Sequence, residues 1–503
     1  MQVNVKQNKK IYGLVFIFFF LIYLITSGGH LDNYDGIAYF LITENLVLEK
    51  SLKIDPNSPS AEKLQFNVTS LLASHGAILT SKTINGTSPK NYINYAPLIS
   101  FIAVPLYVIA LVLKQEPIHF VPYFLNSIII TLTDLVVFAF ASELYKSKKI
   151  GFVLSLLLAV TSFIWPYKST MFTQPLLGLC AVSSVYFLYS IGKNRINHAE
   201  IFGGILLGSV ALAHPTGIMI IPAIFIYALL LLRRDKVKLA KFLIFFFITI
   251  SFIFCLNEIR FGSPMDFGYR DEQSLKFHTD IIGLAGMIFS PGKGIIFFFP
   301  MSILVPLAIW KFLKQERLLT VLIVYIFVTY WLWFGTIVDP YWGASGNWGV
   351  RYLVQVLPFL ILPIGILIRF TKFRFVIAGL AVAGFIVNLL GALVWDMYAY
   401  AYGWERLGLW KFGMKSWDLF TWDWNHSPIV LTWQLLNSDY LSTISNYPKR
   451  VGDFHHIGLA PCGYDSYLYC SLGLFPVIIL FCCIMFVFYL IWRNIRITAT
   501  ISE

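Results

Sequence analysis

Three polar stretches of the sequence hold residue types that could bind an anion or exchange a proton. They are GGHLDNYDGIAYFLITENLVLEK at 28–50, RFGSPMDFGYRDEQ at 260–273 together with the turn SPGKG at 290–294, and DPYWGASGNWGVRYLVQVLPF at 339–359. Arg351 offers bidentate donors suited to a phosphate. Lys293 lies in a flexible turn before an apolar run, where free backbone N–H groups attract anions. The last two stretches therefore predict an anion site, and the first brings a carboxylate, Asp35.

Each of these residues also has a structural interpretation. Asp35 stands where a helix would begin, and an aspartate cap stabilises a helix by about 1 kcal/mol. The SPGKG run lacks the spacing of a P-loop, so Lys293 could belong to a simple Pro/Gly turn. Arg351 could snorkel to lipid phosphates, although three nearby glycines would also let a ligand approach the backbone. Sequence alone leaves both interpretations open.

The composition predicts that these stretches are held by membrane-spanning helices. The 503 residues are 58% hydrophobic and only 13% charged, whereas soluble domains are about 25% charged. A spanning helix needs about 20 mostly apolar residues. The candidate runs lie near 11–28, 95–113, 118–143, 150–165, 170–191, 200–213, 217–232, 239–257, 291–311, 318–335, 351–369, 374–395 and 472–492. We expect an all-α polytopic protein with about 12–13 spanning helices.

The distribution of positive charge predicts the orientation. The net charge of +12 is concentrated in short Lys/Arg clusters beside apolar runs, as in cytoplasmic loops, and no basic stretch is interleaved with aromatics, so nucleic-acid binding is not expected. The clusters place outside the loops 29–94, 259–290 and 337–350 and the segment 396–471. They also require an odd number of crossings between 29 and 145, where two apolar runs occur, so one run is expected to be re-entrant or interfacial. The stretch after Asp35 is expected to form a short amphipathic helix along the outer membrane surface.

Several smaller features complete the expectations. The interruption at His214-Pro215 predicts two short helices. Cys462 and Cys470 could form a disulfide outside the membrane. The tryptophans of segment 396–471 could be interfacial anchors or could stack on sugar rings. Two glycosylation sequons start at Asn67 and Asn85. The pair His455-His456 lacks metal-ligand spacing, and no metal site is expected.

Several motifs together resemble the GT-C superfamily of membrane glycosyltransferases, near the bacterial and archaeal protein-mannosyltransferase and aminoarabinose-transferase families. The motifs are DGIAYF, NYAPLISFIAVPL, WPY, RFGSPMDFGY, SPGKG and GVRYLVQVLPF, in this order over roughly residues 11–370. The expected organisation is a catalytic membrane domain at 1–395, including the loop 29–94, an aromatic-rich outer segment at 396–471, and a final helix with a cytoplasmic tail at 472–503.

The resemblance implies transfer of a hexose or pentose from a polyprenyl-phosphate donor to a glycan, lipid or protein acceptor outside the plasma membrane, with inversion. It implies that Asp35 is the catalytic base. Many relatives carry a second acidic residue directly after this position, where this chain has Gly36. The departing polyprenyl phosphate is an anion that needs cations, and Arg351, Lys293 and Arg260 are the expected phosphate-binding residues. Further expected substrate-binding residues are Asp32, Tyr39, Tyr269, Arg270, Trp342 and Tyr352. No cofactor is expected to be required, although a divalent cation is possible.

Two other functions stay open. A secondary transporter or flippase would also have many helices, but such proteins tend to carry ionisable residues at mid-membrane and repeated broken helices, of which few are visible. A polymerase or ligase of lipid-linked polysaccharides would act on the same class of donor.

Overall fold

The structure is a computed structural model of the chain, and helices dominate it. It describes residues 2–31, 34–55, 57–63, 78–80, 91–191, 196–267, 281–336, 341–343, 346–439 and 464–500. One antiparallel pair of short strands, β1 (Ile78–Thr80) and β2 (Asn91–Ile93), belongs to the long loop after the first helix. The predicted sequons and the pair His455-His456 lie outside the described residues.

Seven helical segments of the described chain are long and apolar enough to cross a membrane. They are α6 (Pro117–Tyr145), α8 (Gln174–Ile191), α11 (Lys236–Phe261), α15 (Arg317–Gly335), the run of short helices Arg351–Ile368, α18 (Arg374–Leu393) with the turn before it, and α24 (Leu474–Thr500). The same bundle contains α1 (Gln2–Ile25), which has 24 residues. It also contains the shorter helices α5 (Leu98–Val112), α7 (Lys148–Thr161), α9 (Ala199–Ala213), α10 (Ile221–Leu232) and α14 (Val305–Phe312). The predicted all-α polytopic fold is confirmed, and each predicted apolar run contains helix.

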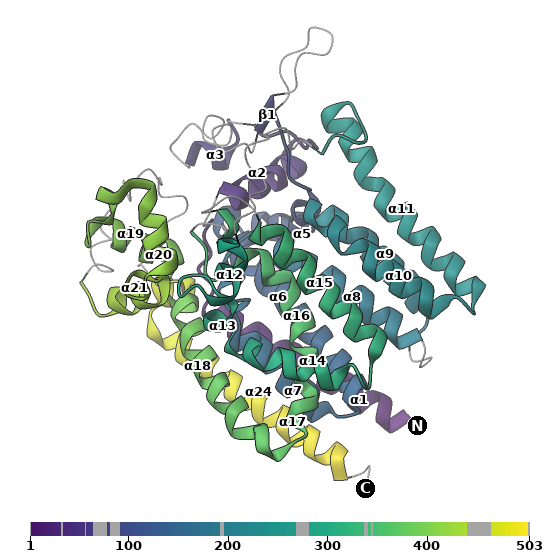
Figure 1. Ribbon diagram of the computed structural model, residues 1–503. Coiled ribbons are helices and arrows are strands. Elements are labelled where there is room, and N and C mark those ends of the chain that lie inside the picture. The colour runs from purple at the N-terminus through teal and green to yellow at the C-terminus, as the bar shows by residue number, and fades with distance from the viewer. Residues whose placement is uncertain are drawn as a thin grey trace.

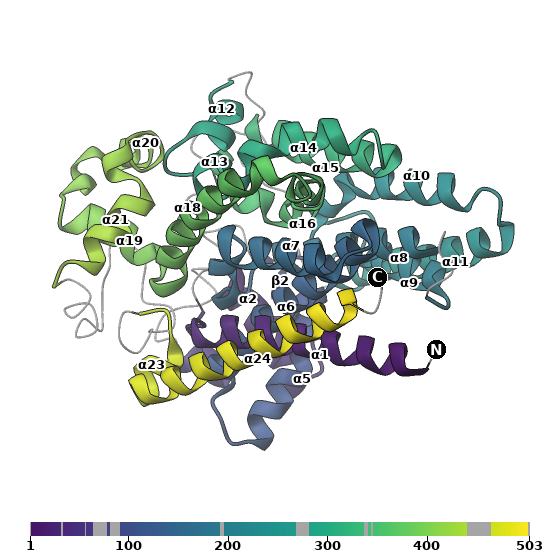
Figure 2. The same ribbon diagram turned by 90° about the horizontal axis from the view of Figure 1, so that it is seen from below.

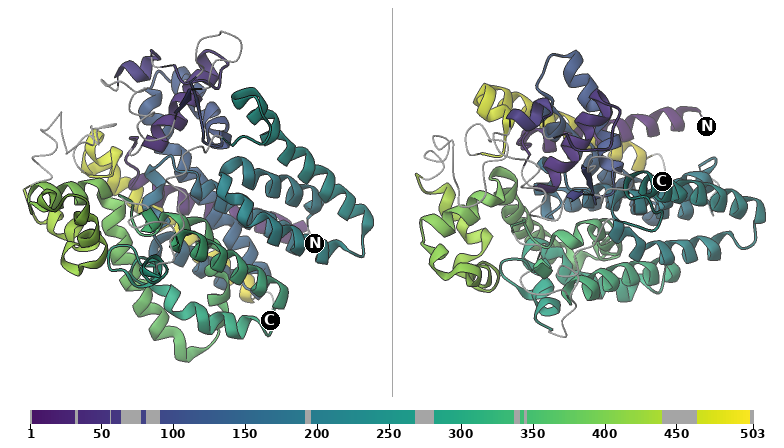
Figure 3. Two further views of the ribbon diagram at one scale, coloured as in Figure 1. Left: turned by 45° about the horizontal axis from the view of Figure 1, so that its top comes forward. Right: turned by 90° about the horizontal axis from the view of Figure 1, so that it is seen from above.

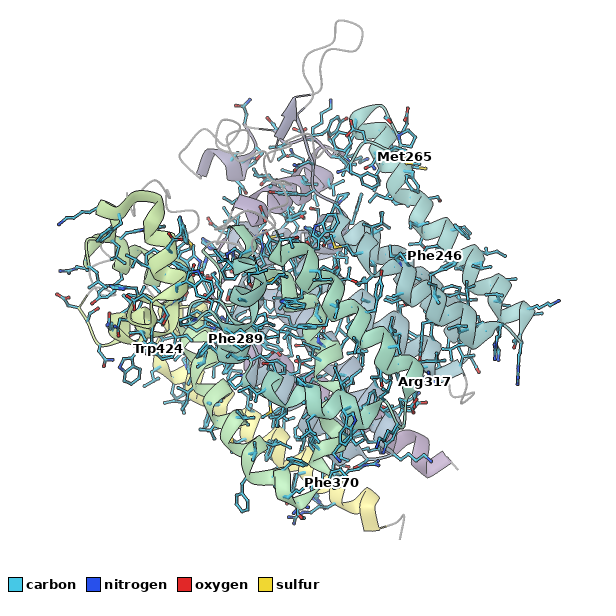
Figure 4. All side chains as sticks on the ribbon, in the orientation of Figure 1. Phe246, Met265, Phe289, Arg317, Phe370 and Trp424 are labelled. Carbon is cyan, nitrogen blue, oxygen red and sulfur yellow. The ribbon has the colours of Figure 1, made fainter. Side chains whose placement is uncertain are left out.

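Both chain ends lie toward one end of the bundle (Figure 1). The last helix, α24, packs beside the first, α1 (Figure 2). Arg317 and Phe370, which belong to two loops predicted to be cytoplasmic, lie toward that same end, whereas Met265 and Trp424 lie away from it (Figure 4). The relative placement of these loops agrees with the orientation predicted from the Lys/Arg clusters.

The sequence predicted an odd number of membrane crossings between residues 29 and 145, and the two apolar runs of this stretch form α5 and α6. The Ser27 hydroxyl, just after α1, donates to the Tyr123 carbonyl near the start of α6, so α6 begins where α1 ends and crosses back. Helix α5 has only 15 residues and is not among the long spans. It packs against α2 (Tyr34–Leu48). It also packs against α6, and which of the two runs fails to span the membrane stays a prediction.

Helix α2 forms as predicted, but it is covered by other elements and is not an exposed amphipathic helix. Its residues from Ile37 to Asn45 are buried, with α3 (Pro59–Lys63) and α5 packed against it. The carboxylate of Glu44 accepts hydrogen bonds from Ser60 at 2.7 Å and Tyr107 at 2.9 Å. Both hydrogen bonds go to Oε1, so this oxygen of the buried carboxylate is satisfied inside the protein, by residues outside α2. Figure 3 shows α2 and α3 beside the strands at one edge of the bundle.

Two interruptions shape the bundle near the polar loops, and the sequence predicted one of them. The break at His214-Pro215 is confirmed, because a 3₁₀ turn, η2 (Pro215–Met219), separates α9 from α10. The run predicted at 291–311 is not one helix. It comprises α13 (Ile295–Phe298), η4 (Pro300–Leu304) and α14, and follows the turn after α12 (Ile282–Phe289). Pro300 begins η4 and Pro306 is the second residue of α14, which explains these two breaks, because proline cannot donate a helical hydrogen bond.

A compact set of short helices, which we call the helical unit 396–436, lies beside the bundle (Figure 1). It contains α19 (Asp396–Glu405), η9 (Leu409–Lys415), α20 (Ser416–Trp422), η10 (Trp424–His426) and α21 (Pro428–Leu436). The ring of Trp404 packs edge-on against Trp417 at 5.3 Å, whereas Trp422, Trp424 and Trp433 are exposed. Trp404 and Trp417 therefore belong to the core of the unit. The three exposed tryptophans fit both predicted roles, membrane anchoring and stacking on sugar rings.

Candidate active site

The structure brings together the carboxylate of the first polar stretch and the guanidinium of the third. Asp35 lies in the first turn of α2, and Arg351 is the first residue of η6 (Arg351–Val356). Nη1 of Arg351 lies 3.0 Å from Oδ2 of Asp35, with the two side chains 19% and 25% exposed. A proton acceptor and an anion-binding group from opposite parts of the chain thus meet in a partly open position.

Tyr95 fixes the second oxygen of this carboxylate. Its hydroxyl donates to Oδ1 of Asp35 at 2.6 Å, and its ring lies 5.3 Å from that of Tyr39 on α2. The segment carrying Tyr95 is held in turn by Arg260, whose Nη1 donates to the Tyr95 carbonyl at 2.7 Å. Arg260 also donates to the side chain of Asn257 at 2.7 Å. In this structure, therefore, the guanidinium of Arg260 supports the segment that orients Asp35.

Aromatic rings orient Arg351. The guanidinium lies over the ring of Phe172 at 4.5 Å and near that of Tyr352 at 5.5 Å. Tyr352 itself stacks on Phe334 with 3.9 Å between ring centroids. Within the described part of the chain, Nε of Arg351 is buried without a hydrogen-bond partner. The guanidinium therefore keeps donor capacity beyond its bond to Asp35.

The turn before Arg351 depends on glycine. Gly346 and Gly349 have φ angles of +73° and +67°. Residues other than glycine adopt such left-handed backbone angles only at a cost in conformational energy. The glycines that the sequence suggested as a route for ligand approach thus have a backbone role in this turn. The turn leads directly into η6, which begins at Arg351.

Lys293 lies in a different environment from Arg351. Its side chain is buried, its ammonium donates to the Asn347 carbonyl, and it lies 5.6 Å from the ring of Tyr400 in the helical unit 396–436. Burial lowers the pKa of Lys293 to about 7, which the charge of Asp396 opposes and that of Arg351 assists. The ammonium is thus held between the turn 290–294 and the helical unit 396–436.

The backbone of the SPGKG turn is also occupied. The N–H of Gly292 donates to the Thr421 carbonyl at 3.1 Å, and that of Gly294 donates to the Ser290 carbonyl at 2.6 Å. The expectation that this turn offers free N–H groups to an anion is therefore wrong for these two amides. The turn anchors α20 instead.

His214 is a neighbour of the site that the sequence marked only as a helix break. Its Nδ1 accepts from the N–H of Thr216 at 3.2 Å. Burial lowers the pKa of His214 to about 4, an effect assisted by the charge of Arg351 and opposed by that of Asp35. His214 is therefore neutral near pH 7 and lies within electrostatic range of the ion pair. The His-Pro break was the signal available in the sequence.

Of the other predicted substrate-binding residues, some lie in the described part of the chain and some do not. Trp342 is buried and packs 5.9 Å from Trp422 of the helical unit 396–436, so its ring is part of that packing. Asp32, Tyr269 and Arg270 lie outside the described residues.

Among the residues that the structure describes, no group of three or more His, Cys, Asp or Glu side chains could hold a metal ion. Cys470 is disulfide-bonded, and Cys462, its predicted partner, lies outside the described residues.

The helical segments define the class of fold, an all-helical polytopic bundle. No protein-family model matches the chain, and no curated protein matches its sequence. The crystal structure of ArnT from Cupriavidus metallidurans bound to undecaprenyl phosphate is similar, with a TM-score of 0.50 over 86% of this chain and 79% of ArnT. The two sequences are 13% identical, so this likeness shows the fold alone. The predicted GT-C-like fold class is confirmed.

Proposed function

We propose that the chain is a glycosyltransferase that moves a sugar from a polyprenyl-phosphate donor to a hydroxyl of a glycan, lipid or protein acceptor on the outer face of the cell membrane. The observation that carries the proposal is the ion pair of Asp35 and Arg351, a carboxylate and a guanidinium 3.0 Å apart, which we propose to act as the base and the phosphate-binding group. The likeness in fold to ArnT, whose structure holds undecaprenyl phosphate, supports a polyprenyl phosphate as the donor's leaving group.

The proposed reaction is a single displacement. Arg351 binds the phosphate of the donor, and the acceptor oxygen attacks the anomeric carbon from the opposite side while its proton passes to Asp35. The bond between the anomeric carbon and the phosphate oxygen breaks, and its electron pair leaves with the polyprenyl phosphate. One base is enough for this step, and the configuration inverts, whereas glycoside hydrolysis ordinarily uses two carboxyl groups.

The ion pair itself suggests how the base is controlled. Before the donor binds, both carboxylate oxygens of Asp35 accept a hydrogen bond, one from Tyr95 and the other from Arg351. A donor phosphate would draw the guanidinium toward itself, and the carboxylate would then be free to face an acceptor hydroxyl. This order, donor before acceptor, limits deprotonation of the acceptor to the loaded site.

The described structure offers no specific support for a transporter. Asp134, the acidic residue predicted inside a span, is buried and accepts a hydrogen bond from Tyr23. The pair joins α1 to α6. A structural pair of this kind explains the residue without a transport pathway.

The proposal is tested with purified protein in liposomes. We expect Arg351→Ala to weaken undecaprenyl phosphate binding and to lower transfer from undecaprenyl-phosphate-linked hexose or pentose to acceptors from a cell-envelope extract. Arg369→Ala is the matched control, because Arg369 follows the opposite end of the same helical run and donates to the Tyr145 carbonyl at 2.8 Å. Equal losses in the two variants, or no transfer and no lipid binding by the unmodified chain, would contradict the proposal.

A further inference from the structure

The segment before α24 is attached to the loop that follows α1, although more than four hundred residues separate them. The N–H of Tyr467 donates to the Ser27 carbonyl at 2.8 Å, and the Ser466 hydroxyl donates to the Ile25 carbonyl at 2.8 Å. Asp465 is held by its own N–H, which donates to the Leu393 carbonyl at 2.8 Å. The segment 464–467 thus connects the end of α1 with the end of α18.

Asp465 places a buried carboxylate at the centre of this junction. Its Oδ2 lies 2.8 Å from Nζ of Lys168, and its Oδ1 lies 3.0 Å from Nε2 of His30. The side chains of Lys168 and His30 are fully buried, and that of Asp465 is 4% exposed. A carboxylate only accepts hydrogen bonds, so His30 carries a proton on Nε2. We call these three residues the Asp465 clasp.

The first arm of the clasp leads to the proposed base. His30 precedes Asp35 by five residues, in the loop between α1 and α2. The loop fits closely around Asp465, because a Cβ on Gly28 would lie 1.8 Å from Oδ1 of Asp465. The N–H of Gly28 donates to the Ser169 hydroxyl at 3.0 Å. The path of the chain into Asp35 therefore depends on Asp465.

The second arm leads to the proposed phosphate-binding residue. Lys168 lies in the short 3₁₀ helix η1 (Trp165–Ser169), four residues before Phe172, the ring under the guanidinium of Arg351. The side-chain amide of Asn126 holds this stretch in place, since it donates to the Thr170 carbonyl at 2.6 Å and the Phe172 carbonyl at 3.1 Å. The position of Arg351 therefore depends on the same carboxylate.

We propose that Asp465 is a positioning residue of the candidate active site, because one of its oxygens fixes the loop that leads to Asp35 and the other fixes the stretch that carries Phe172 beneath Arg351. The proposal rests on the function proposed above. It gives the end of the segment 396–471 a role in setting the distance between the base and the phosphate-binding group, without contact between Asp465 and a substrate.

The first test separates positioning from stability. Asp465→Asn removes the charged partner that lies 2.8 Å from the buried ammonium of Lys168, so it is expected to lower both the melting temperature and kcat. The double variant Asp465→Leu with Lys168→Met removes both charges and is expected to recover most of the melting temperature. We expect its kcat to stay about 10–100-fold low, because small displacements of reacting groups cost this much. Recovery of wild-type kcat together with stability would overturn the proposal.

A second variant separates the two arms. His30→Gln removes only the arm to Asp35, so we expect a lower kcat with unchanged affinity for undecaprenyl phosphate. The control is Asp134→Asn, a buried carboxylate that contacts Tyr23, for which kcat should be unchanged. A wild-type kcat in folded His30→Gln would contradict the role of this arm.

Hydrogen exchange distinguishes failure of the clasp from failure of the proposed function. The double variant is expected to exchange backbone amides at 26–31 and 165–172 faster than the unmodified chain. Absence of transfer by the unmodified chain would remove the proposed function, yet this exchange would still decide whether Asp465 holds the two segments. Unchanged exchange in both segments would overturn the clasp.

Discussion

Replacing Asp35 by Asn is expected to have opposite effects on turnover and on lipid binding. Loss of the base should lower kcat by about 10²–10⁴-fold. Affinity for undecaprenyl phosphate should rise, because in the unmodified chain the phosphate competes with the carboxylate for the guanidinium of Arg351. A variant that is inactive but binds its lipid more tightly is not expected from unfolding.

The expected gain in affinity for undecaprenyl phosphate follows from the solvent exposure of the Asp35–Arg351 ion pair. The side chains of Arg351 and Asp35 are 19% and 25% exposed, so the pair lies between an open surface pair, worth about 0–1 kcal/mol, and a desolvated interface pair, worth about 1.5–7 kcal/mol. Taking about 1 kcal/mol, the release of Arg351 from Asp35 would tighten lipid binding about fivefold.

Titration of undecaprenyl phosphate into detergent-solubilised protein, followed by intrinsic fluorescence or calorimetry, measures this affinity. Asp235→Asn is the matched control. Asp235 forms an ion pair with Lys238 at 3.4 Å on a loop far along the chain, and asparagine also caps helices well. Unchanged or weaker lipid binding by folded Asp35→Asn would refute the competition between phosphate and carboxylate.

Three further expectations concern the supports of the site. Tyr95→Phe removes a hydrogen bond to a charged acceptor, worth about 1.5–3 kcal/mol, and should lower kcat about tenfold or more in single-turnover assays; an unchanged rate would remove Tyr95 from the orientation of the base. Gly292→Ala would place a Cβ 2.0 Å from a backbone oxygen of α20 and should lower the melting temperature by several degrees in a thermal-shift assay, whereas Gly379→Ala, with nothing within 4 Å, should not. Burial alone would raise the pKa of Asp465, but the charge of Lys168 and the hydrogen bond from His30 lower it to about 2. The unfolded carboxyl binds its proton first as pH falls, so the clasp contributes fully above about pH 4 and loses about 2 kcal/mol toward pH 2. The melting temperature of Asp465→Asn should therefore fall less between pH 5 and pH 3 than that of the unmodified chain.

The sequence predicted the framework because that information is carried by long runs. Apolar runs of spanning length and clusters of Lys and Arg are repeated signals, so the helices and the relative sides of the loops followed from them. The break at His214-Pro215 followed from the missing N–H of proline. Asp35 and Arg351 were predicted from different stretches of the sequence as members of one site, the first as a base and the second as a phosphate-binding cation.

The remaining parts of the site depend on contacts between distant residues that no local pattern shows. The spacing of Ile37, Phe40 and Leu41 suggested an amphipathic surface helix, but α3 and α5 bury α2. The turn around Lys293 looked open to an anion, but Thr421 and Asn347 occupy its donors. Single residues without a motif, such as Tyr95 and Asp465, gain their roles only from three-dimensional neighbours.

The attachment of Asp465 to His30 and Lys168 has a consequence for biosynthesis. The ribosome delivers α1 and η1 to the membrane long before Asp465 is translated, so the ammonium of Lys168 first meets the interior of the bundle without its counter-ion. The early helices can insert, but their final packing has to wait for the segment before α24. In a nascent chain released before residue 464, we expect the loop at 28–30 and the stretch at 168–172 to lack this attachment to each other.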